Sequence, residues 1–244
     1  MRARDLYRAD MEKLRIDVWS DIACPWCYIG KRRLESALAA FPERENVDVV
    51  WHAFELDPSA PRERDATESH AARIAKKYGK SLSEAEKMIQ RVTDVAADDG
   101  LQFRFDIARS GNTFDAHRLV RLGAEHGLQG ALKERLLAAY FSHGESVGNT
   151  EVLQRIGVEA GLDSKEVSEL LASDRFAAEV RADEAAAQKI GISGVPFFVM
   201  GGKFGVSGAQ PAELLLSALN EAWAQQEEEP AAHTEGAVCG PEGC

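Results

Sequence analysis

Cysteine is scarce in this sequence, with four among 244 residues. Small extracellular domains that rely on disulfides for stability carry a much higher density, so a disulfide scaffold is excluded. A few thiols in a chain of this length are better explained as catalytic or metal-binding groups. The four residues are Cys24, Cys27, Cys239 and Cys244.

Long apolar runs and an excess of basic residues are also missing. No apolar segment approaches the roughly 20 residues that a membrane-spanning helix needs. The chain has 40 acidic and 29 basic residues, which argues against nucleic acid or an anionic membrane as a partner. Charges interrupt residues 1–10 throughout, so the apolar core of a secretory signal is missing as well. We therefore expect a cytoplasmic protein.

The periodicity of apolar residues predicts a strand, a helix and a second strand at the start of the chain. Residues 14–18 alternate apolar and polar side chains, which predicts a strand that runs on to residue 20. Apolar residues after Cys24 recur at helical spacing as far as Phe41, and Pro42 ends that helix because the residue before a proline disfavours the α conformation. A strand is predicted over residues 47–54. The first cysteine pair therefore lies at a strand-to-helix corner.

The middle of the chain, residues 65–190, predicts a block of helices without a repeat. It is rich in Ala, Leu, Glu and Arg, with glycines between the segments. Thr150 and Ser164 stand where helix N-caps are expected. The predicted helices cover residues 81–97, 116–126, 130–141 and 150–160, with two more between 164 and 189.

Strand signals return after this block. Residues 195–200 and 203–206 are apolar runs that flank Gly201 and Gly202, and two glycines there predict a hairpin because a type I′ turn needs positive φ at both positions. A last helix begins near Pro211. From residue 225 the chain is acidic and rich in small residues, which predicts a flexible tail over residues 225–244.

The Cys24-Pro25-Trp26-Cys27 segment carries the clearest chemistry. At the start of a helix, free backbone N–H groups and the helix dipole favour a thiolate, so we expect Cys24 to be the nucleophile. Cys27, one turn later, is close enough to form or release a disulfide with it. Pro25 restrains the loop, and Trp26 supplies an apolar surface beside the sulfur.

The same spacing has two other interpretations. The pair could be a buried structural couple, or it could provide two ligands of a zinc site. Zinc needs two further ligands, and Cys239 and Cys244 are the cysteines that could supply them. Our prediction is a redox pair with no metal.

Two motifs resemble a known family. Residues 20–30 (Ser-Asp-Ile-Ala-Cys-Pro-Trp-Cys-Tyr-Ile-Gly) and 191–198 (Gly-Ile-Ser-Gly-Val-Pro-Phe-Phe) closely resemble FrnE-like proteins in the DsbA branch of the thioredoxin superfamily. The resemblance covers about residues 13–224. It implies that Pro196 is cis and lies against Cys24, and that the backbone of Val195 pairs with an incoming peptide.

The resemblance also implies the fold class and domain organisation. The expected fold is α/β and thioredoxin-like, with a large all-helical insertion between the N-terminal strand-helix-strand and the C-terminal hairpin-helix. Residues 13–64 and 191–224 would form one discontinuous domain, and residues 65–190 the insertion.

The same branch contains 2-hydroxychromene-2-carboxylate isomerases and kappa-class glutathione transferases, which use glutathione and usually carry serine where this chain has Cys24. Cysteine in place of that serine favours redox chemistry in this protein. Residues 112–119 resemble the insertion segment that faces the active site in these relatives, which makes Asn112 and His117 candidate substrate-binding residues. The alternative is a capping asparagine and a partly exposed helical histidine.

Cys239 and Cys244 form a Cys-x4-Cys pair in a stretch that contains glycine and proline and bends easily. A flexible tail of about 20 residues spans roughly 25 Å, enough to reach Cys24 on the same molecule. We therefore consider a second redox pair that exchanges electrons with the first. The alternative is a structural clip or an idle tail.

Three functions follow. The first is a protein disulfide oxidoreductase or isomerase that acts on protein thiols and disulfides, with glutathione or a thioredoxin system as a candidate electron partner. It needs no cofactor beyond its redox-active disulfide, and glutathione is a candidate co-substrate. The second is a glutathione-dependent isomerase or transferase on a small aromatic molecule. The third is a chaperone-like protein that holds extended peptides beside Pro196. The presence of both active-site cysteines favours the first.

Overall fold

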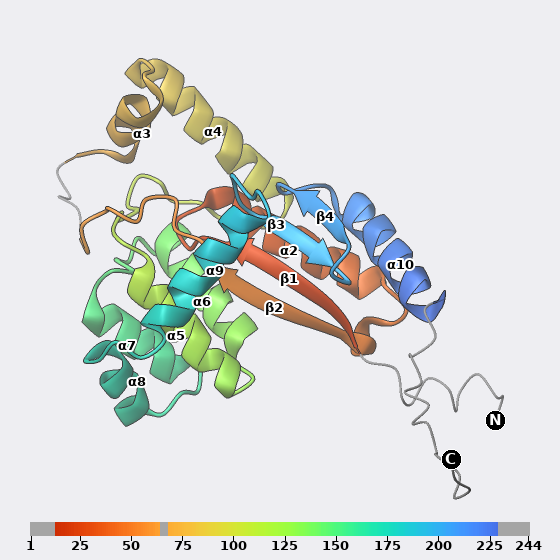
Figure 1. The fold of residues 1–244 in the computed structure, drawn as a ribbon. Helices are drawn as coiled ribbons and strands as arrows, with labels where there is room; N and C mark the ends of the chain where they lie inside the picture. Colours follow the sequence, from red (N-terminus) through yellow and green to blue (C-terminus); the bar gives the residue numbers. More distant parts are fainter. Residues whose placement is uncertain (1–12, 64–67, 229–244) are drawn as a thin grey trace, which may run out of the picture.

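Four strands form one mixed sheet in the part of the chain that the computed structural model describes, residues 13–63 and 68–228. Their order is β2-β1-β3-β4, in which β1 and β2 are parallel and the other pairs antiparallel (Figure 1). The predicted strands are confirmed, with bounds β1 (Leu14–Ser20), β2 (Val47–Ala53), β3 (Phe197–Met200) and β4 (Phe204–Ser207).

Helices cover both faces of this sheet. Helix α2 (Pro25–Ala40) connects β1 to β2 through a 3-10 turn at Arg44–Asn46 and packs against α10 (Ala212–Glu228). The alternation in β1 explains the arrangement, because its buried apolar residues share the main core with those two helices.

The opposite face of the sheet meets helix α9 (Ala177–Lys189), which crosses in front of it in Figure 1. Asp183 of α9 makes this contact. One of its carboxylate oxygens accepts the Ala53 N–H at 2.9 Å, the other lies 2.8 Å from the His52 ring, and its carbonyl accepts the Trp19 indole N–H at 3.1 Å.

The hairpin between β3 and β4 follows the glycine prediction. Gly201 and Gly202 have φ values of 59° and 69°, and the Lys203 N–H donates to the Met200 carbonyl at 3.2 Å. Both positions lie in the left-handed region that favours glycine.

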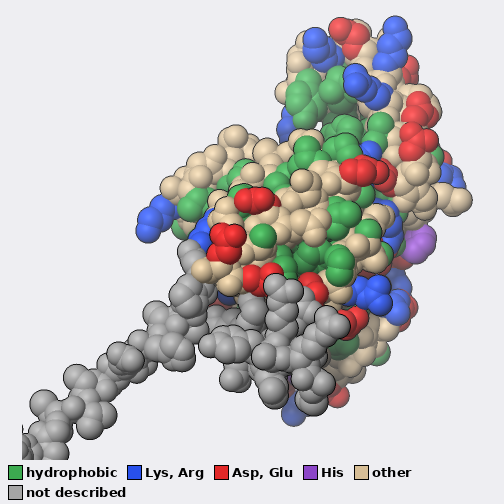
Figure 2. Space-filling view, turned by 90° about the vertical axis from the view of Figure 1, so that its right-hand side faces the viewer, with side chains coloured by type: hydrophobic (Ala, Val, Ile, Leu, Met, Phe, Trp, Pro, Cys, Tyr) green, Lys and Arg blue, Asp and Glu red, His purple; other side chains and the backbone are tan. Residues whose placement is uncertain are grey.

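Between β2 and β3 the chain is helical, as expected. The helices are α3 (His70–Tyr78), α4 (Leu82–Asp98), α5 (Phe114–Glu125), α6 (Gln129–Phe141), α7 (Thr150–Glu159), α8 (Ser164–Leu171) and α9. Helix α3 was not predicted, although Ser69 caps its start and Gly79 ends it in the left-handed conformation. In Figure 2 the lobe that contains α3 and α4 projects beyond the rest of the molecule.

Three expected boundaries are wrong by a few residues. The N-caps of α7 and α8 are Asn149 and Asp163, whose side chains accept two backbone N–H groups each, so Thr150 and Ser164 are the first helical residues. Helix α10 continues to Glu228, beyond the predicted start of the tail at residue 225. Cys239 and Cys244 lie outside the described residues.

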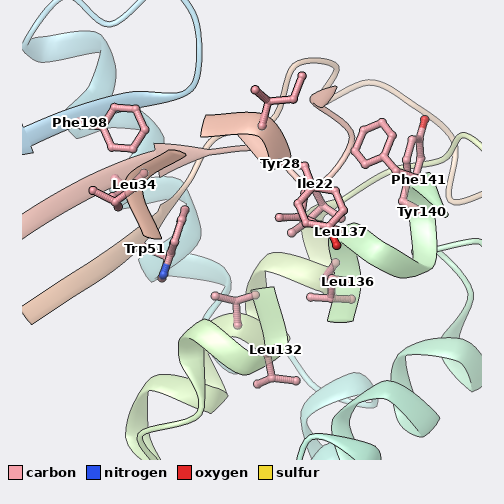
Figure 3. Close-up of a cluster of buried hydrophobic side chains, with 14 of the residues drawn as sticks. Ile22, Tyr28, Leu34, Trp51, Leu132, Leu136, Leu137, Tyr140, Phe141 and Phe198 are labelled. Atoms are coloured by element: carbon pink, nitrogen blue, oxygen red, sulfur yellow. The ribbon is translucent and has the colours of Figure 1, made fainter. Parts of the chain in front are cut away.

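The sheet and the helical block share one hydrophobic core. Figure 3 shows Leu132, Leu136 and Leu137 of α6 in the same buried cluster as Leu34 of α2, Trp51 of β2 and Phe198 of β3. The main cluster therefore contains side chains from both parts of the chain. Its shared packing fixes α6 against the corner where β1 ends and α2 begins.

Candidate active site

Cys24 caps the N-terminus of α2. Its backbone is extended, with φ −95° and ψ 114°, and Pro25 takes the first helical position, where its missing N–H is not needed. The Cys27 N–H donates to the Cys24 carbonyl at 3.0 Å, which fixes the first turn. Both cysteines are free thiols, at the predicted strand-to-helix corner.

The loop before β3 closes over this corner. The Val195–Pro196 peptide bond is cis, as the resemblance implied, and Cys24 Sγ lies 3.4 Å from the Val195 carbonyl oxygen. Pro196 also packs against α2, because a Cβ on Gly30 would stand 2.8 Å from Pro196 Cγ. Segments 171 residues apart in sequence thus meet at the redox pair.

Both cysteines are buried, Cys27 completely. Cys24 retains 4% of its surface and Cys27 none, while the neighbouring Trp26 is 41% exposed. An approaching molecule would therefore meet Trp26 and Cys24 first. Cys27 can be reached only through Cys24 or after a local movement, which suits a resolving role.

Two opposing influences act on the protonation state of Cys24. A hydrogen bond to Cys27 and burial, together with repulsion from negative charge on Cys27 and Asp21, raise the pKa of the Cys24 thiol well above its ordinary value. The helix N-terminus, which favours a thiolate, and the buried surroundings of Cys24 therefore act in opposite directions on the pKa of its thiol.

Asp21 and His117 form a buried pair beside the cysteines. His117 Nε2 lies 3.4 Å from Asp21 Oδ1, and the other Asp21 oxygen accepts the Leu56 N–H at 2.8 Å. Burial favours the neutral acid, but the contacts with His117 and Leu56 hold the pKa of Asp21 below its ordinary value. Burial lowers the pKa of His117 despite Asp21. His117 is 2% exposed, so the alternative of a partly exposed histidine is wrong.

Asn112 lies farther along the same side. Its side-chain NH2 donates to Glu55 Oε1 at 3.1 Å and its oxygen accepts the Phe114 N–H at 2.8 Å, so it also steadies the start of α5. Burial, opposed by the ion pair with Arg181, raises the pKa of Glu55 to about 7. Glu55 is followed by Leu56, whose N–H donates to Asp21. Asn112 is therefore connected to Asp21 through the Glu55–Leu56 segment.

Lys133 of α6 is completely buried under the corner. Its ammonium donates to the Ser20 carbonyl at 3.1 Å and lies 5.6 Å from the centre of the Trp51 ring. Burial lowers the pKa of Lys133 to about 8, against the attraction of negative charge on Cys27, Asp21 and Cys24. This lysine is the principal site residue that we did not predict.

Comparison with known proteins agrees with this geometry. The family model described as a DSBA-like thioredoxin domain matches residues 15–220. The chain belongs to the DsbA-like thioredoxin domain family. The match includes the redox corner and the cis-proline loop, and it places the helical block inside the same family domain.

Several relatives resemble this DsbA-like domain. The crystal structure of a probable DsbA oxidoreductase from Streptomyces coelicolor is 44% identical, with a TM-score of 0.84 and coverage of 95% of this chain and 98% of that one. The uncharacterized protein YwbO of Bacillus subtilis is 24% identical over 77% of this chain and 87% of its own length.

Two more distant structures share the fold. 2-Hydroxychromene-2-carboxylate isomerase is 14% identical, with a TM-score of 0.63 and coverage of 89% of this chain and all of its own. The cytosolic disulfide reductase DsbM of Pseudomonas aeruginosa, with GSH, is 17% identical, with a TM-score of 0.58 and coverage of 88% and 98%.

Sequence features of this DsbA-like domain could have revealed the residues that we missed. Lys133 is separated from Gln129 and Leu137 by one helical turn each and therefore occupies the buried face of α6. A lysine on an otherwise buried face is unusual and marks a special environment. Asp21 stands inside the first family motif, but its burial depends on α5.

Other types of site find no support in the described part of the chain. No group of three His, Cys, Asp or Glu side chains there could hold a metal ion. No helix within residues 13–63 and 68–228 is long and apolar enough to cross a membrane. A cavity of about 770 Å³ lies between α3, α4 and residues 105–110, and neither Cys24 nor Cys27 lines it.

Proposed function

We propose that this protein is a thiol–disulfide oxidoreductase that exchanges disulfides with protein substrates at Cys24. One observation carries the proposal: Cys24, at the N-terminus of α2, lies 3.4 Å from the carbonyl of Val195 in the cis-proline loop, with Cys27 one turn away. Family membership supports an enzyme of the oxidoreductase or isomerase kind. The cysteine pair favours redox chemistry over the isomerase alternative.

The cycle has two exchanges. The Cys24 sulfur, once it has lost its proton, attacks one sulfur of a substrate disulfide, and the other substrate sulfur leaves as a thiolate. Cys27 then attacks Cys24 in the mixed disulfide, which releases the second substrate thiol and leaves the Cys24–Cys27 disulfide. The reverse sequence oxidises a substrate dithiol. Exposed Trp26, within the Cys24–Cys27 segment, and exposed Leu56, whose N–H donates to Asp21, offer apolar surface to a polypeptide.

Glutathione is the candidate electron partner, and the cytoplasm the candidate compartment. The DsbM structure, which shares this fold, is named as a cytosolic disulfide reductase with GSH. Asn112 and His117 are candidate binding residues because Asn112 joins the Glu55 loop and His117 contacts Asp21 next to the pair.

The test uses paired cysteine variants. Cys24→Ser should lower the rate of glutathione-dependent insulin reduction at least 100-fold, because the attacking sulfur is gone. Cys27→Ser should accumulate a mixed disulfide on Cys24, detectable by mass spectrometry, because the resolving sulfur is gone. If Cys24→Ser retains the wild-type rate, exchange does not occur at Cys24.

The same variants separate the alternatives. Glutathione-dependent isomerisation of 2-hydroxychromene-2-carboxylate that survives in Cys24→Ser would favour the small-molecule function. Prevention of aggregation that survives loss of both Cys24 and Cys27 would favour a peptide-holding function.

The tail pair, Cys239 and Cys244, is proposed as a second redox pair that passes electrons between Cys24–Cys27 and other thiols. A Cys239→Ser/Cys244→Ser double variant should slow insulin reduction or thiol oxidation while both active-site cysteines still react with iodoacetamide. Unchanged rates would eliminate the shuttle.

A further inference from the structure

Lys133 is a buried cation without a carboxylate partner. Among the described residues no Asp or Glu lies within ion-pair distance of its ammonium, which contacts the Ser20 carbonyl and the Trp51 ring. Lys31, a second buried lysine, contrasts with it, because it is paired with Glu35 and Glu134 at 2.5 Å each. A buried charge needs compensation, so negative charge must come to Lys133 from elsewhere.

The groups around Lys133 identify the source. Asp21, after the end of β1, carries one negative charge. Its carboxylate oxygens already contact the His117 ring and accept two backbone N–H groups. The positive or ionisable groups near Lys133 are Lys31 on α2 and His117 on α5. Besides Asp21, the two sulfurs at the start of α2 are the groups near Lys133 that can carry negative charge; Cys27 attracts the Lys133 ammonium most strongly, ahead of Asp21 and Cys24.

We propose that Lys133 is the buried counter-charge of the Cys24–Cys27 pair, stabilising the thiolate of the reduced pair and releasing its proton when the disulfide forms. The proposal rests on the proposed exchange at Cys24. Lys133 acts on the sulfurs through its charge and is therefore a positioning residue for the reaction.

The step balances for a disulfide substrate. In the reduced protein one sulfur is a thiol, the other a thiolate, and Lys133 an ammonium. The substrate S–S bond breaks, the enzyme S–S bond forms, and two electrons pass to the substrate sulfurs. The thiol proton and the Lys133 proton convert those sulfurs into two thiols, through solvent where necessary. Lys133 is then a neutral amine beside a neutral disulfide, while the Asp21 carboxylate keeps its contacts with His117 and two backbone N–H groups.

The test of this proposal measures the acidity of the Cys24 and Cys27 thiols. Lys133→Met removes the charge and keeps a similar shape, and apolar replacement of a buried charge usually preserves folding. The pH dependence of iodoacetamide alkylation at Cys24 and Cys27, followed by peptide mass spectrometry, reports the pair without interference from Cys239 and Cys244. We expect the Lys133→Met midpoint to rise by at least one pH unit, which is about a tenfold slower reaction at pH 7.

Two variants control for packing. Lys31→Met removes another buried lysine of the same region and should leave the alkylation rate at pH 7 within twofold of wild type. Lys133→Arg keeps a positive charge and should restore most of the reactivity lost in Lys133→Met. Circular dichroism checks that each variant is folded, and if the arginine does not fit, the two methionine variants still decide the matter.

Three results would be informative. A shift in Lys133→Met alone supports the counter-charge. An unchanged midpoint in folded Lys133→Met overturns it, as does an equal shift in Lys31→Met. Because alkylation needs no substrate, this result is independent of insulin reduction: failure of wild-type exchange would overturn the proposed function, whereas normal exchange with an unshifted Lys133→Met midpoint would overturn only the role of Lys133.

Discussion

At the scale of single residues, the site is a set of titratable side chains that the fold has removed from water. Asp21, His117 and Lys133 are buried next to the cysteine pair. Glu55 is also buried, and it immediately precedes Leu56, whose N–H donates to Asp21. Burial favours the neutral form of each, so which groups stay charged depends on their few contacts. Asp21 keeps its charge through contacts with donors, while Glu55 binds a proton near neutral pH.

Glu55 gives a prediction about stability and pH. Its pKa is about 7 in the folded protein against 4.5 for an ordinary glutamate. Between these values the folded state holds a proton that the unfolded chain has released, so the unfolding free energy falls as pH rises, and it stops falling above pH 7. Glu55→Gln cannot titrate, so its stability relative to wild type should rise by about 2 kcal/mol from pH 5 to pH 7.

Urea unfolding at several pH values measures this difference. Glu159→Gln, which removes a surface glutamate paired with Arg155, is the matched control and should follow the wild-type curve at every pH. Parallel curves for Glu55→Gln and wild type would mean that Glu55 is already ionised below pH 7.

At the scale of elements, the redox corner depends on how closely α2 approaches the cis-proline loop. Gly30 lies within α2, where glycine costs about 1 kcal/mol relative to alanine. The structure explains its presence, because a Cβ there would stand 2.8 Å from Pro196 Cγ and 3.3 Å from Phe198 Cζ. Glycine at position 30 weakens the helix, but it allows α2 to contact the cis-proline loop closely.

Gly30→Ala should therefore destabilise the protein despite the better helix former. Overpacking of this kind costs about 1–3 kcal/mol, and a displaced Pro196 should also slow insulin reduction. Denaturant midpoints and reduction rates measure the two effects.

Gly130→Ala provides the comparison on another helix, since nothing lies within 4 Å of a Cβ at Gly130 in α6. This variant should be neutral or more stable by up to about 1 kcal/mol, with an unchanged rate. Equal stability of the two alanine variants would show that Gly30 does not set the approach of Pro196.

At the scale of the whole molecule, the helical block and the sheet behave as one structure. Strand β2 is at the edge of the sheet, and Gln129 of α6 covers it. The Gln129 side chain accepts the Trp51 N–H and donates to the Trp51 carbonyl, both at 3.0 Å. This contact satisfies backbone groups that an open edge would leave unpaired, and it holds α6 so that Lys133, one turn later, lies below the redox pair.

Gln129→Ala should lower the unfolding free energy by about 2 kcal/mol, because it leaves two backbone groups of Trp51 without their partner. Gln90→Ala, at an exposed position of α4, should change it by less than about 0.5 kcal/mol. Tryptophan fluorescence, which reports β1, β2, α2 and α10, and far-UV circular dichroism, which reports mainly the helices, should give the same midpoint in urea. Separate midpoints would contradict a single cooperative unit.

The sequence alone determined the order of strands and helices, the hairpin at Gly201 and Gly202 and the position of Cys24 and Cys27 at a helix start. These features depend on local periodicity and turn chemistry, which a short window contains. It missed α3, a short helix that buries no residue and whose only large apolar side chains are Ile74 and Tyr78. It placed two N-caps one residue late because Asn149-Thr150 and Asp163-Ser164 each offer two capping residues in succession.

Only the tertiary structure decided the charge environment of the redox pair. Asp21 follows β1, whereas His117 and Lys133 lie on α5 and α6 about 100 residues later in the chain. Nothing local to any of the three specifies that all are buried together. A pKa depends on desolvation and on neighbouring charges in space, so the helix-start argument favoured a Cys24 thiolate while the folded environment raises its pKa. The identity of the reacting sulfurs could be inferred from sequence, but their acidity depends on how α5 and α6 pack against the corner.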